Sequence, residues 1–380
     1  MISKDRPYAK DLPRDEKGRI IIDLSHPHII EDADYFMQTA INFQKTGRYT
    51  NLRPNPNPNS SYGKWVREEV RRCYEGYVRE SDGEWVTGDM YFFLNYCPMI
   101  LVEKGENSNT GKRIVSFPRF WEGHYYLFHY LYQARQNGKH AFQLASRAKG
   151  KSYCGAALLA KRFLLGENEE VNKKVISYIT ASDKKYLQGG DQTLDKFIFD
   201  IDHCANNTEF PSRKLINSLN KLEWTSGYKD LDTDTNRGTL NSVVGISSAN
   251  DESKLRGTRG VLYILEEMGS FPRLLDIYNN MRYSVEQGKI TYGLIFAYGT
   301  SGDNDSDFSS AQEIMYNPDG YNVYAIPNVY DKEGQSRKEF TYFFPAYLNY
   351  EGCYDENGNS DVTKSLLLIL EDRYQVKYNS

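Results

Sequence analysis

One short segment restricts the possible folds of this chain more than any other. A predicted strand at residues 141–145 runs into a polar turn, and the turn opens an apolar helix predicted over 153–165 that stops before Gly166. The turn ends in Gly150-Lys151-Ser152. This spacing matches the phosphate-binding pattern G-x-x-x-x-G-K-[S/T], with Ala145 at the position of the first glycine.

The residue types of this loop suit a nucleotide such as ATP. Backbone N–H groups of the turn and the N-terminus of the helix surround a polyphosphate. Lys151 would reach the β- and γ-phosphates, and Ser152 would bind Mg²⁺. The predicted ATP-binding residues of the loop are Ala145, Ser146, Arg147, Ala148, Lys149, Gly150, Lys151 and Ser152. A basic turn between a strand and a helix, with no ligand, is the alternative interpretation.

Strands and helices alternate along the middle of the chain. Four further apolar runs have the length of strands, at residues 175–180, 243–247, 261–265 and 294–298, and helical patterns lie between them. We read the polar stretch 230–241 as a loop. The alternation predicts an α/β fold with a mostly parallel sheet and helices on both faces.

Two adjacent carboxylates, Glu266 and Glu267, follow the apolar run 261–265. Carboxylates at the end of a buried strand are costly unless they meet a cation or solvent. The carboxyl edge of a parallel sheet is also where α/β proteins bind ligands. We therefore expect Glu266 to hold Mg²⁺ through water and Glu267 to orient and deprotonate an attacking water. A solvated start of a helix is the alternative.

A third element, Gly299-Thr300-Ser301-Gly302, directly follows the apolar run 294–298. A small polar turn at the end of a strand can hydrogen-bond a γ-phosphate or its attacking water. Thr300 and Ser301 are therefore predicted to couple hydrolysis to the rest of the molecule.

Together, the three motifs resemble those of large terminase subunits, the DNA-packaging motors of tailed bacteriophages. The resemblance implies a P-loop NTPase of the RecA-like (ASCE) type, with ATP and Mg²⁺ as ligands. It implies that Arg147 acts as an arginine finger within its own subunit. It also implies that Arg256 is offered to a neighbouring subunit, with Arg259 as an equal competitor. Phe120 and Trp121 would form the adenine pocket by stacking.

The chain divides into three predicted regions. Residues 1–105 form a helical, aromatic-rich region, residues 106–330 the ATPase core, and residues 331–380 a C-terminal subdomain or linker. Large terminases continue into a nuclease domain, and the 78 residues after Gly302 are too few for one. We therefore expect no nuclease domain in this chain, and we read residues 362–374 as a helix.

Charge and hydropathy limit the partners. The net charge is −4 and no run of about 18 apolar residues occurs, so a membrane span is not expected. The resemblance implies double-stranded DNA, a portal protein, a small terminase subunit and further copies in a ring as partners. It implies a place in the cytoplasm of an infected bacterial host, at the portal vertex of the procapsid. A helicase-like or recombination ATPase, or a docking protein that binds nucleotide without turnover, are the alternatives.

Overall fold

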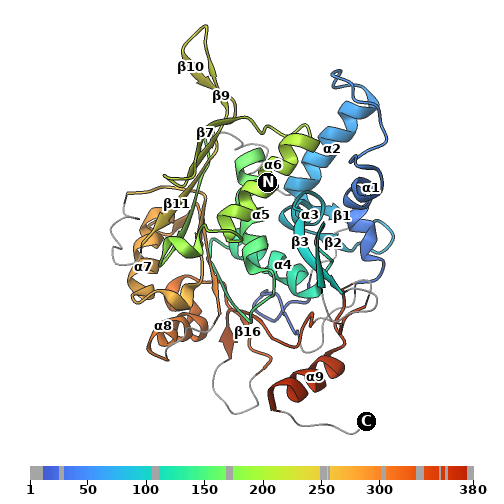
Figure 1. The fold of residues 1–380 in the computed structure, drawn as a ribbon. Helices are drawn as coiled ribbons and strands as arrows, with labels where there is room; N and C mark the ends of the chain where they lie inside the picture. Colours follow the sequence, from blue (N-terminus) through green and yellow to red (C-terminus); the bar gives the residue numbers. More distant parts are fainter. Residues whose placement is uncertain are drawn as a thin grey trace.

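The computed structural model describes residues 12–24, 30–104, 111–167, 174–248, 255, 257–300, 305–330, 338–350, 352–355 and 358–374. An eight-stranded sheet lies at its centre, with the strand order β18-β5-β15-β12-β6-β11-β8-β7 (Figure 1). These strands are β5 (Ala141–Ala145), β6 (Ile176–Ala181), β7 (Lys214–Ser218), β8 (Glu223–Ser226), β11 (Ser242–Ser247), β12 (Leu262–Leu265), β15 (Leu294–Gly299) and β18 (Tyr342–Phe344).

The sheet is mostly parallel, as predicted. Each pairing from β18 through β11 is parallel, whereas β8 pairs antiparallel with both β11 and β7. The five predicted strands correspond to β5, β6, β11, β12 and β15. All four residues of β12 and all six of β15 are buried, as expected for strands covered on both faces. Because β15 lies between β5 and β12, the three motifs end at one edge of the sheet.

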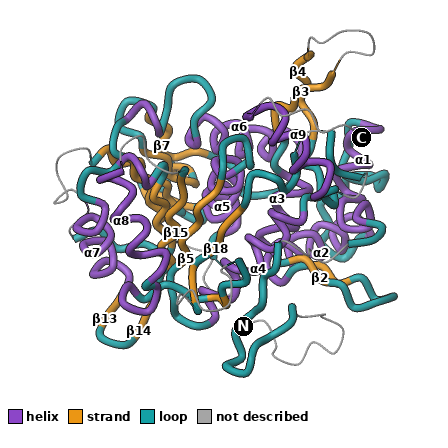
Figure 2. Tube along the Cα trace, turned by 90° about the horizontal axis from the view of Figure 1, so that it is seen from below, coloured by secondary structure: helices purple, strands orange, loops and turns teal. Residues whose placement is uncertain are grey.

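Helices cover both faces of the sheet (Figures 1 and 2). On one side lie α4 (Glu122–Gln136), α5 (Lys151–Leu165) and α6 (Thr193–Asn207), and on the other α7 (Leu274–Val285) and α8 (Asp305–Tyr316). Every residue of α5 from Cys154 onward is buried. A helix that is buried all round must pack on two sides, and α5 does so between the sheet and an outer helical layer.

The outer layer comes from the N-terminal part of the chain. It contains η1 (Ala33–Met37), α1 (Gln38–Thr46), α2 (Ser61–Glu75) and α3 (Gly88–Tyr96). The hydroxyl of Ser60 caps α2, and that of Thr87 caps α3. Eight of the nine residues of α3 are buried, which explains the aromatic cluster of this segment. The helical N-terminal region of the predicted fold class is therefore present.

The remaining elements are short. They are the hairpin strands β1 (Tyr77–Val78) and β2 (Trp85–Val86), β3 (Met99–Lys104) and β4 (Gly111–Ser116), β9 (Tyr228–Asp230) and β10 (Thr235–Arg237), β13 (Glu286–Gln287) and β14 (Ile290–Thr291), and β16 (Ile326–Pro327) and β17 (Glu339–Phe340), with the 3-10 helices η2 (Lys184–Tyr186), η4 (Met268–Ser270) and η5 (Pro318–Tyr321). The stretch 230–241, predicted as a loop, thus contains part of a hairpin. The sequence of this hairpin lacks the apolar pattern of a strand, and two ion pairs, Arg237 with Asp230 and Lys229 with Asp234, join its two sides.

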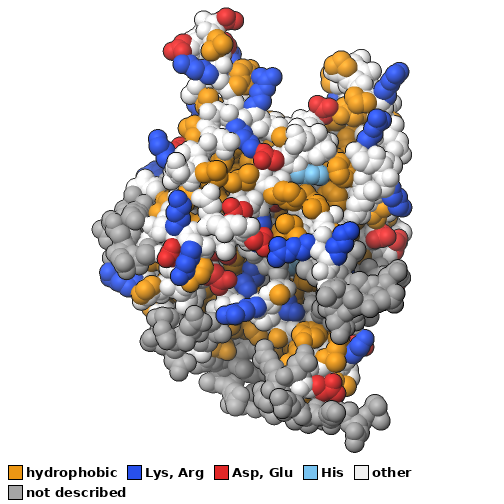
Figure 3. Space-filling model, in the orientation of Figure 1, with side chains coloured by type: hydrophobic (Ala, Val, Ile, Leu, Met, Phe, Trp, Pro, Cys, Tyr) orange, Lys and Arg blue, Asp and Glu red, His pale blue; other side chains and the backbone are white. Residues whose placement is uncertain are grey.

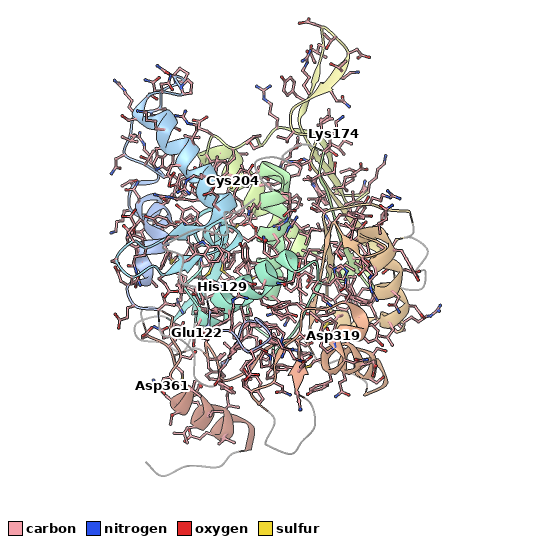
Figure 4. The ribbon with its side chains drawn as sticks, turned by 180° about the vertical axis from the view of Figure 1, so that it is seen from behind. Glu122, His129, Lys174, Cys204, Asp319 and Asp361 are labelled. Atoms are coloured by element: carbon pink, nitrogen blue, oxygen red, sulfur yellow. The ribbon has the colours of Figure 1, made fainter. Side chains whose placement is uncertain are left out.

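The segment after residue 330 joins the core. It provides β18, which pairs in parallel with β5 at the edge of the sheet. It then leads to α9 (Val362–Tyr374), which has the bounds predicted from the sequence. Glu122 at the start of α4 accepts hydrogen bonds from the Ser360 N–H (2.8 Å) and the Asn349 amide (3.1 Å). Figure 4 shows Glu122 above Asp361, which directly precedes α9. None of the described helices is both long and apolar enough to cross a bilayer.

Candidate active site

The loop between β5 and α5 has the strained backbone of a tight turn. Ala148 has φ 60° and Gly150 has φ 71°, both in the left-handed region. This region disfavours residues with a Cβ, so Ala148 costs roughly 1–2 kcal/mol in this conformation. A Cβ at Gly150 would also come within 2.8 Å of His124 Nε2. The sequence therefore needs glycine at position 150 for two independent reasons.

Lys149 anchors this loop from behind. Its ammonium donates hydrogen bonds to the carbonyls of Leu348 (2.5 Å) and Asn349 (3.4 Å). Its own carbonyl contacts His124 Nε2 at 3.0 Å. Burial lowers the pKa of Lys149 to about 8. The side chain thus points to the C-terminal segment, and only the backbone of Lys149 is left to contact a phosphate.

Lys151, in contrast, lies between the loop and the acidic residues. Its ammonium donates hydrogen bonds to the carbonyls of Ser146 (3.1 Å) and Ala145 (3.5 Å). Burial lowers its pKa, while the negative charges of Glu267 and Glu266 act in the opposite direction. The structure therefore brings the predicted phosphate-binding lysine within electrostatic reach of both predicted carboxylates.

The other loop side chains differ in exposure. Arg147 is exposed, and no ion pair joins it to any of the described residues. Ser152 is half-buried in the first turn of α5. The hydroxyl of Ser146 is buried and has no hydrogen-bond partner within the described part of the chain. Buried polar atoms are normally paired, so this hydroxyl is suited to a bound group.

Glu266 is held on two sides immediately after β12. Its Oε2 accepts hydrogen bonds from the hydroxyl of Thr193 (2.5 Å), the first residue of α6, and from that of Tyr298 on β15. The residue is 4% exposed. Burial raises the pKa of Glu266 to about 7, and the nearby charge of Glu267 acts in the same direction. The two carboxylates therefore differ in environment although they are adjacent in the sequence.

Glu267 is the more accessible of the two and has an unusual backbone. Its φ is 47°, in the left-handed region, and its side chain is half-buried. Its Oε2 lies 3.4 Å from the backbone nitrogen of Thr300 and 3.5 Å from the Thr300 hydroxyl, both of which donate to it. A strained non-glycine residue often marks a functional site. The predicted coupling residue Thr300 thus contacts the predicted catalytic carboxylate.

Two predicted site residues, Arg256 and Ser301, lie outside the described residues. Arg259, the competitor of Arg256, is exposed.

The predicted adenine residues have separate surroundings. Phe120 is 3% exposed and packs against Phe36 and Tyr125, with both ring centroids 6.0 Å away. The Trp121 ring lies 5.2 Å from the ring of His124, the residue that contacts the loop, and is tilted by 34° relative to it. Its indole N–H is buried without a partner among the described residues. Trp121 is thus the one of the pair that lies beside the loop, whereas the Phe120 ring is part of the helical core.

Sequence reasoning missed three residues of this site. His124, Thr193 and Tyr298 contact the loop or Glu266 from different elements. Thr193 and Tyr298 are 73 and 32 residues from Glu266 along the chain, so no local motif marks them. Of these residues, only Tyr298 has a signal in the sequence, which is its position in the strand before the Gly299-Thr300 turn.

The residues present fit Mg²⁺ by type. The Ser152 hydroxyl and the Glu266 carboxylate are oxygen donors, which Mg²⁺ prefers, and Mg²⁺ usually takes only one or two protein ligands beside phosphates and water. No group of three or more His, Cys, Asp or Glu side chains that could hold a metal occurs within the described part of the chain. A site for Mg²⁺ here would therefore depend on the phosphates of a nucleotide.

No protein-family model matches the sequence, and no curated protein matches it. Solved structures of phage large terminases are similar to this chain. The large terminase of bacteriophage HK97 is 13% identical, with 75% of this chain and 51% of that chain covered and a TM-score of 0.42. The large terminase ATPase domain of Thermus phage P74-26 is 13% identical, with 61% and 82% covered and a TM-score of 0.40.

A large terminase of a thermophilic bacteriophage, in complex with ADP, is 9% identical, with 64% and 46% covered and a TM-score of 0.34. This chain spans about half the length of the HK97 protein.

Proposed function

We propose that this chain is an ATP-hydrolysing motor of the large terminase type, which moves double-stranded DNA into a procapsid. The observation that carries the proposal is the convergence of Lys151, Glu266 and Glu267 at one edge of the sheet. Lys151 comes from the loop after β5, the carboxylates follow β12, and β15 between them ends at Thr300. A protein that only bound nucleotide would not need a carboxylate placed to activate water.

The residues would divide the reaction as follows. The loop N–H groups and the Lys151 ammonium bind the β- and γ-phosphates and stabilise the charge that builds up there. Glu267 orients a water molecule and accepts its proton as the water oxygen bonds to the γ-phosphorus and the bond to the leaving oxygen breaks. The exposed Arg147 is free to neutralise the γ-phosphate from within the same subunit.

Ser152 and Glu266 would hold Mg²⁺, which when bound neutralises phosphate charge. Trp121, beside the loop, is the better placed of the two proposed adenine contacts. Thr300 would sense the state of Glu267 through its two hydrogen bonds. Ser301 would take part in coupling with Thr300, and Arg256 would reach the nucleotide of a neighbouring subunit.

The proposal extends to partners. A motor of this type acts as a homo-oligomeric ring on the portal protein of a capsid, receives DNA with a small terminase subunit, and works in the cytoplasm of an infected bacterial host. The test is ATP-dependent protection of duplex DNA from nuclease, with this chain and procapsids that carry a portal. Protection that needs ATP and Lys151 supports the proposal. Strand separation without protection would favour a helicase-like ATPase.

A further inference from the structure

Surface charge does not point to a partner site on the face of the molecule drawn in Figure 3. The Lys and Arg side chains described there are interspersed with Asp and Glu side chains. A more specific arrangement is buried, in the turn that follows β12 and carries Glu267. This turn has contacts on both sides that hold its backbone, apart from the contacts between the Glu267 carboxylate and Thr300.

The turn holds Glu267 in a backbone conformation that is rare for a residue with a Cβ. Glu267 has φ 47° and ψ 58°, in the left-handed region, and η4 (Met268–Ser270) follows at once. Because this region is disfavoured for residues other than glycine, the surrounding structure has to stabilise it. The contacts of the turn therefore determine where the Glu267 side chain begins.

Ser270, the last residue of η4, binds the carbonyl of Glu267 twice. Its backbone N–H donates at 2.8 Å and its hydroxyl at 2.7 Å. The hydroxyl of Ser182, which directly follows β6, lies 2.7 Å from the hydroxyl of Ser270. A hydroxyl has one hydrogen to donate, and a carbonyl only accepts. Since the Ser270 hydrogen goes to Glu267, Ser182 is the donor to Ser270.

Strand β15 approaches the same turn from the opposite side. A Cβ at Gly299, the last residue of β15, would lie 2.8 Å from the backbone nitrogen of Met268 and 3.3 Å from the carbonyl carbon of Glu267. Met268 itself is fully buried. Because β12 lies between β6 and β15 in the sheet, the turn is held from both neighbouring strands.

The connection between β6 and α6 reaches both carboxylates. At its start, Ser182 contacts the Glu267 turn through Ser270. At its end, Thr193 donates a hydrogen bond to Glu266 at 2.5 Å. Ser182 is only 7% exposed, so water competes little for its hydrogen bond. The placement of the two carboxylates thus depends on one connection.

We propose that Ser182 and Ser270 are positioning residues, which hold the backbone of Glu267 so that its carboxylate meets the attacking water. The inference rests on the proposed function, in which Glu267 accepts the proton of that water. A general base must come within about 3 Å of the group that it deprotonates. Misplacement by about 1 Å can lower a rate roughly 10²-fold. Neither serine has to contact the nucleotide, so the effect should fall on turnover and not on binding.

The test compares turnover with binding in the full chain. We would measure kcat and KM for ATP with Mg²⁺ and duplex DNA, and the Kd of a fluorescent ATP analogue. In Ser270→Ala, kcat should fall at least tenfold while the Kd stays within about twofold of the unmodified value. Ser270→Thr keeps the hydroxyl and should restore most of the turnover. Thermal unfolding of each variant shows that it is folded.

Ser248→Ala is the matched control. The Ser248 hydroxyl is fully buried and lies 3.0 Å from that of Thr180, at the same edge of the sheet. Within the described part of the chain, no hydrogen bond joins it to the turn of Glu267. This variant therefore loses a buried pair of hydroxyls of the same kind, and it should keep the kcat of the unmodified chain.

A double variant shows whether the two serines act in series. Ser182→Ala should lower kcat in the unmodified chain and have little further effect in Ser270→Ala. Additive losses, an equal loss in Ser248→Ala, or binding that weakens in proportion to kcat would overturn the inference. Full turnover by Ser270→Ala beside an inactive Glu267→Gln would overturn it too, and would leave the proposed function standing. An active Glu267→Gln would overturn both.

Discussion

The hydroxyl of Tyr298 donates a hydrogen bond to the carboxylate of Glu266, which joins the ends of two neighbouring strands. Tyr298 belongs to β15 and Glu266 directly follows β12. With Thr193 donating to the same oxygen, Glu266 is fixed between the sheet and the start of α6. The adjacent Glu267 has no such enclosure and contacts Thr300 instead. Glu266 is therefore fixed and buried, whereas Glu267 is the more accessible of the two carboxylates.

The raised pKa of Glu266 predicts a pH dependence of stability. Burial raises this pKa from 4.5 to about 7, so the folded protein holds the proton more tightly than the unfolded chain. The stabilisation is fully present below pH 4.5 and is lost as the pH rises through 7. At about 1.4 kcal/mol for each pKa unit, the loss between pH 5 and pH 8 is roughly 2–3 kcal/mol.

Glu266→Gln keeps the size of the side chain and removes the titration. Urea unfolding at the two pH values should show that the unmodified chain loses this free energy relative to the variant. If the free energy of unfolding changed with pH in the same way in both proteins, the result would contradict the proposed enclosure of the Glu266 carboxylate.

Gly155 on α5 leaves room for the Tyr298 hydroxyl. A Cβ at this position would come within 2.4 Å of that oxygen and 3.1 Å of the ring carbon that bears it. Gly155→Ala should therefore lower the free energy of unfolding by about 1–3 kcal/mol, the usual cost of overpacking. In a Tyr298→Phe background the nearest atom is gone, and the same substitution should cost less. Equal costs in both backgrounds, measured by denaturant unfolding, would mean that the hydroxyl does not occupy this space.

The two lysines of the loop should differ when each is replaced by methionine, which keeps the apolar stem. Lys151→Met should weaken binding of a fluorescent ATP analogue at least tenfold, because the phosphates lose their cation. Lys149→Met should instead destabilise the protein by about 1–3 kcal/mol, since buried carbonyls lose a charged donor. Thermal unfolding and nucleotide titration on both variants separate the two effects. If Lys149→Met instead weakened nucleotide binding and Lys151→Met only lowered stability, the result would show that Lys149 faces the ligand.

The sequence predicts well the secondary structure that surrounds the candidate site. Residue periodicity and spacing, which are local properties, predict the strand, loop and helix at residues 141–165 and the apolar strand before Glu266. The bounds of α9 and of β5 agree with the prediction. Such segments are recognisable because the pattern of apolar and polar residues that determines their burial occurs in consecutive residues.

Contacts between distant segments could not be predicted in this way. His124 lies 25 residues from the Lys149 carbonyl that it contacts, and Thr193 lies 73 residues from Glu266. The motif also gives no reason for Lys149 to point toward Leu348, because that contact needs the chain to return after β18. The β9–β10 hairpin is held by ion pairs and not by an apolar pattern, so its sequence resembles a loop.

Glu267→Gln tests the central claim most directly. The variant keeps the shape of the side chain but cannot accept a proton, and the exposed Glu313→Gln on α8 is the matched control. We would measure ATP turnover and ATP binding by both variants and by the unmodified chain, with Mg²⁺ and duplex DNA. Turnover should fall roughly 10²–10⁴-fold in Glu267→Gln alone, with binding retained. Turnover by Glu267→Gln equal to that of the unmodified chain would contradict the account.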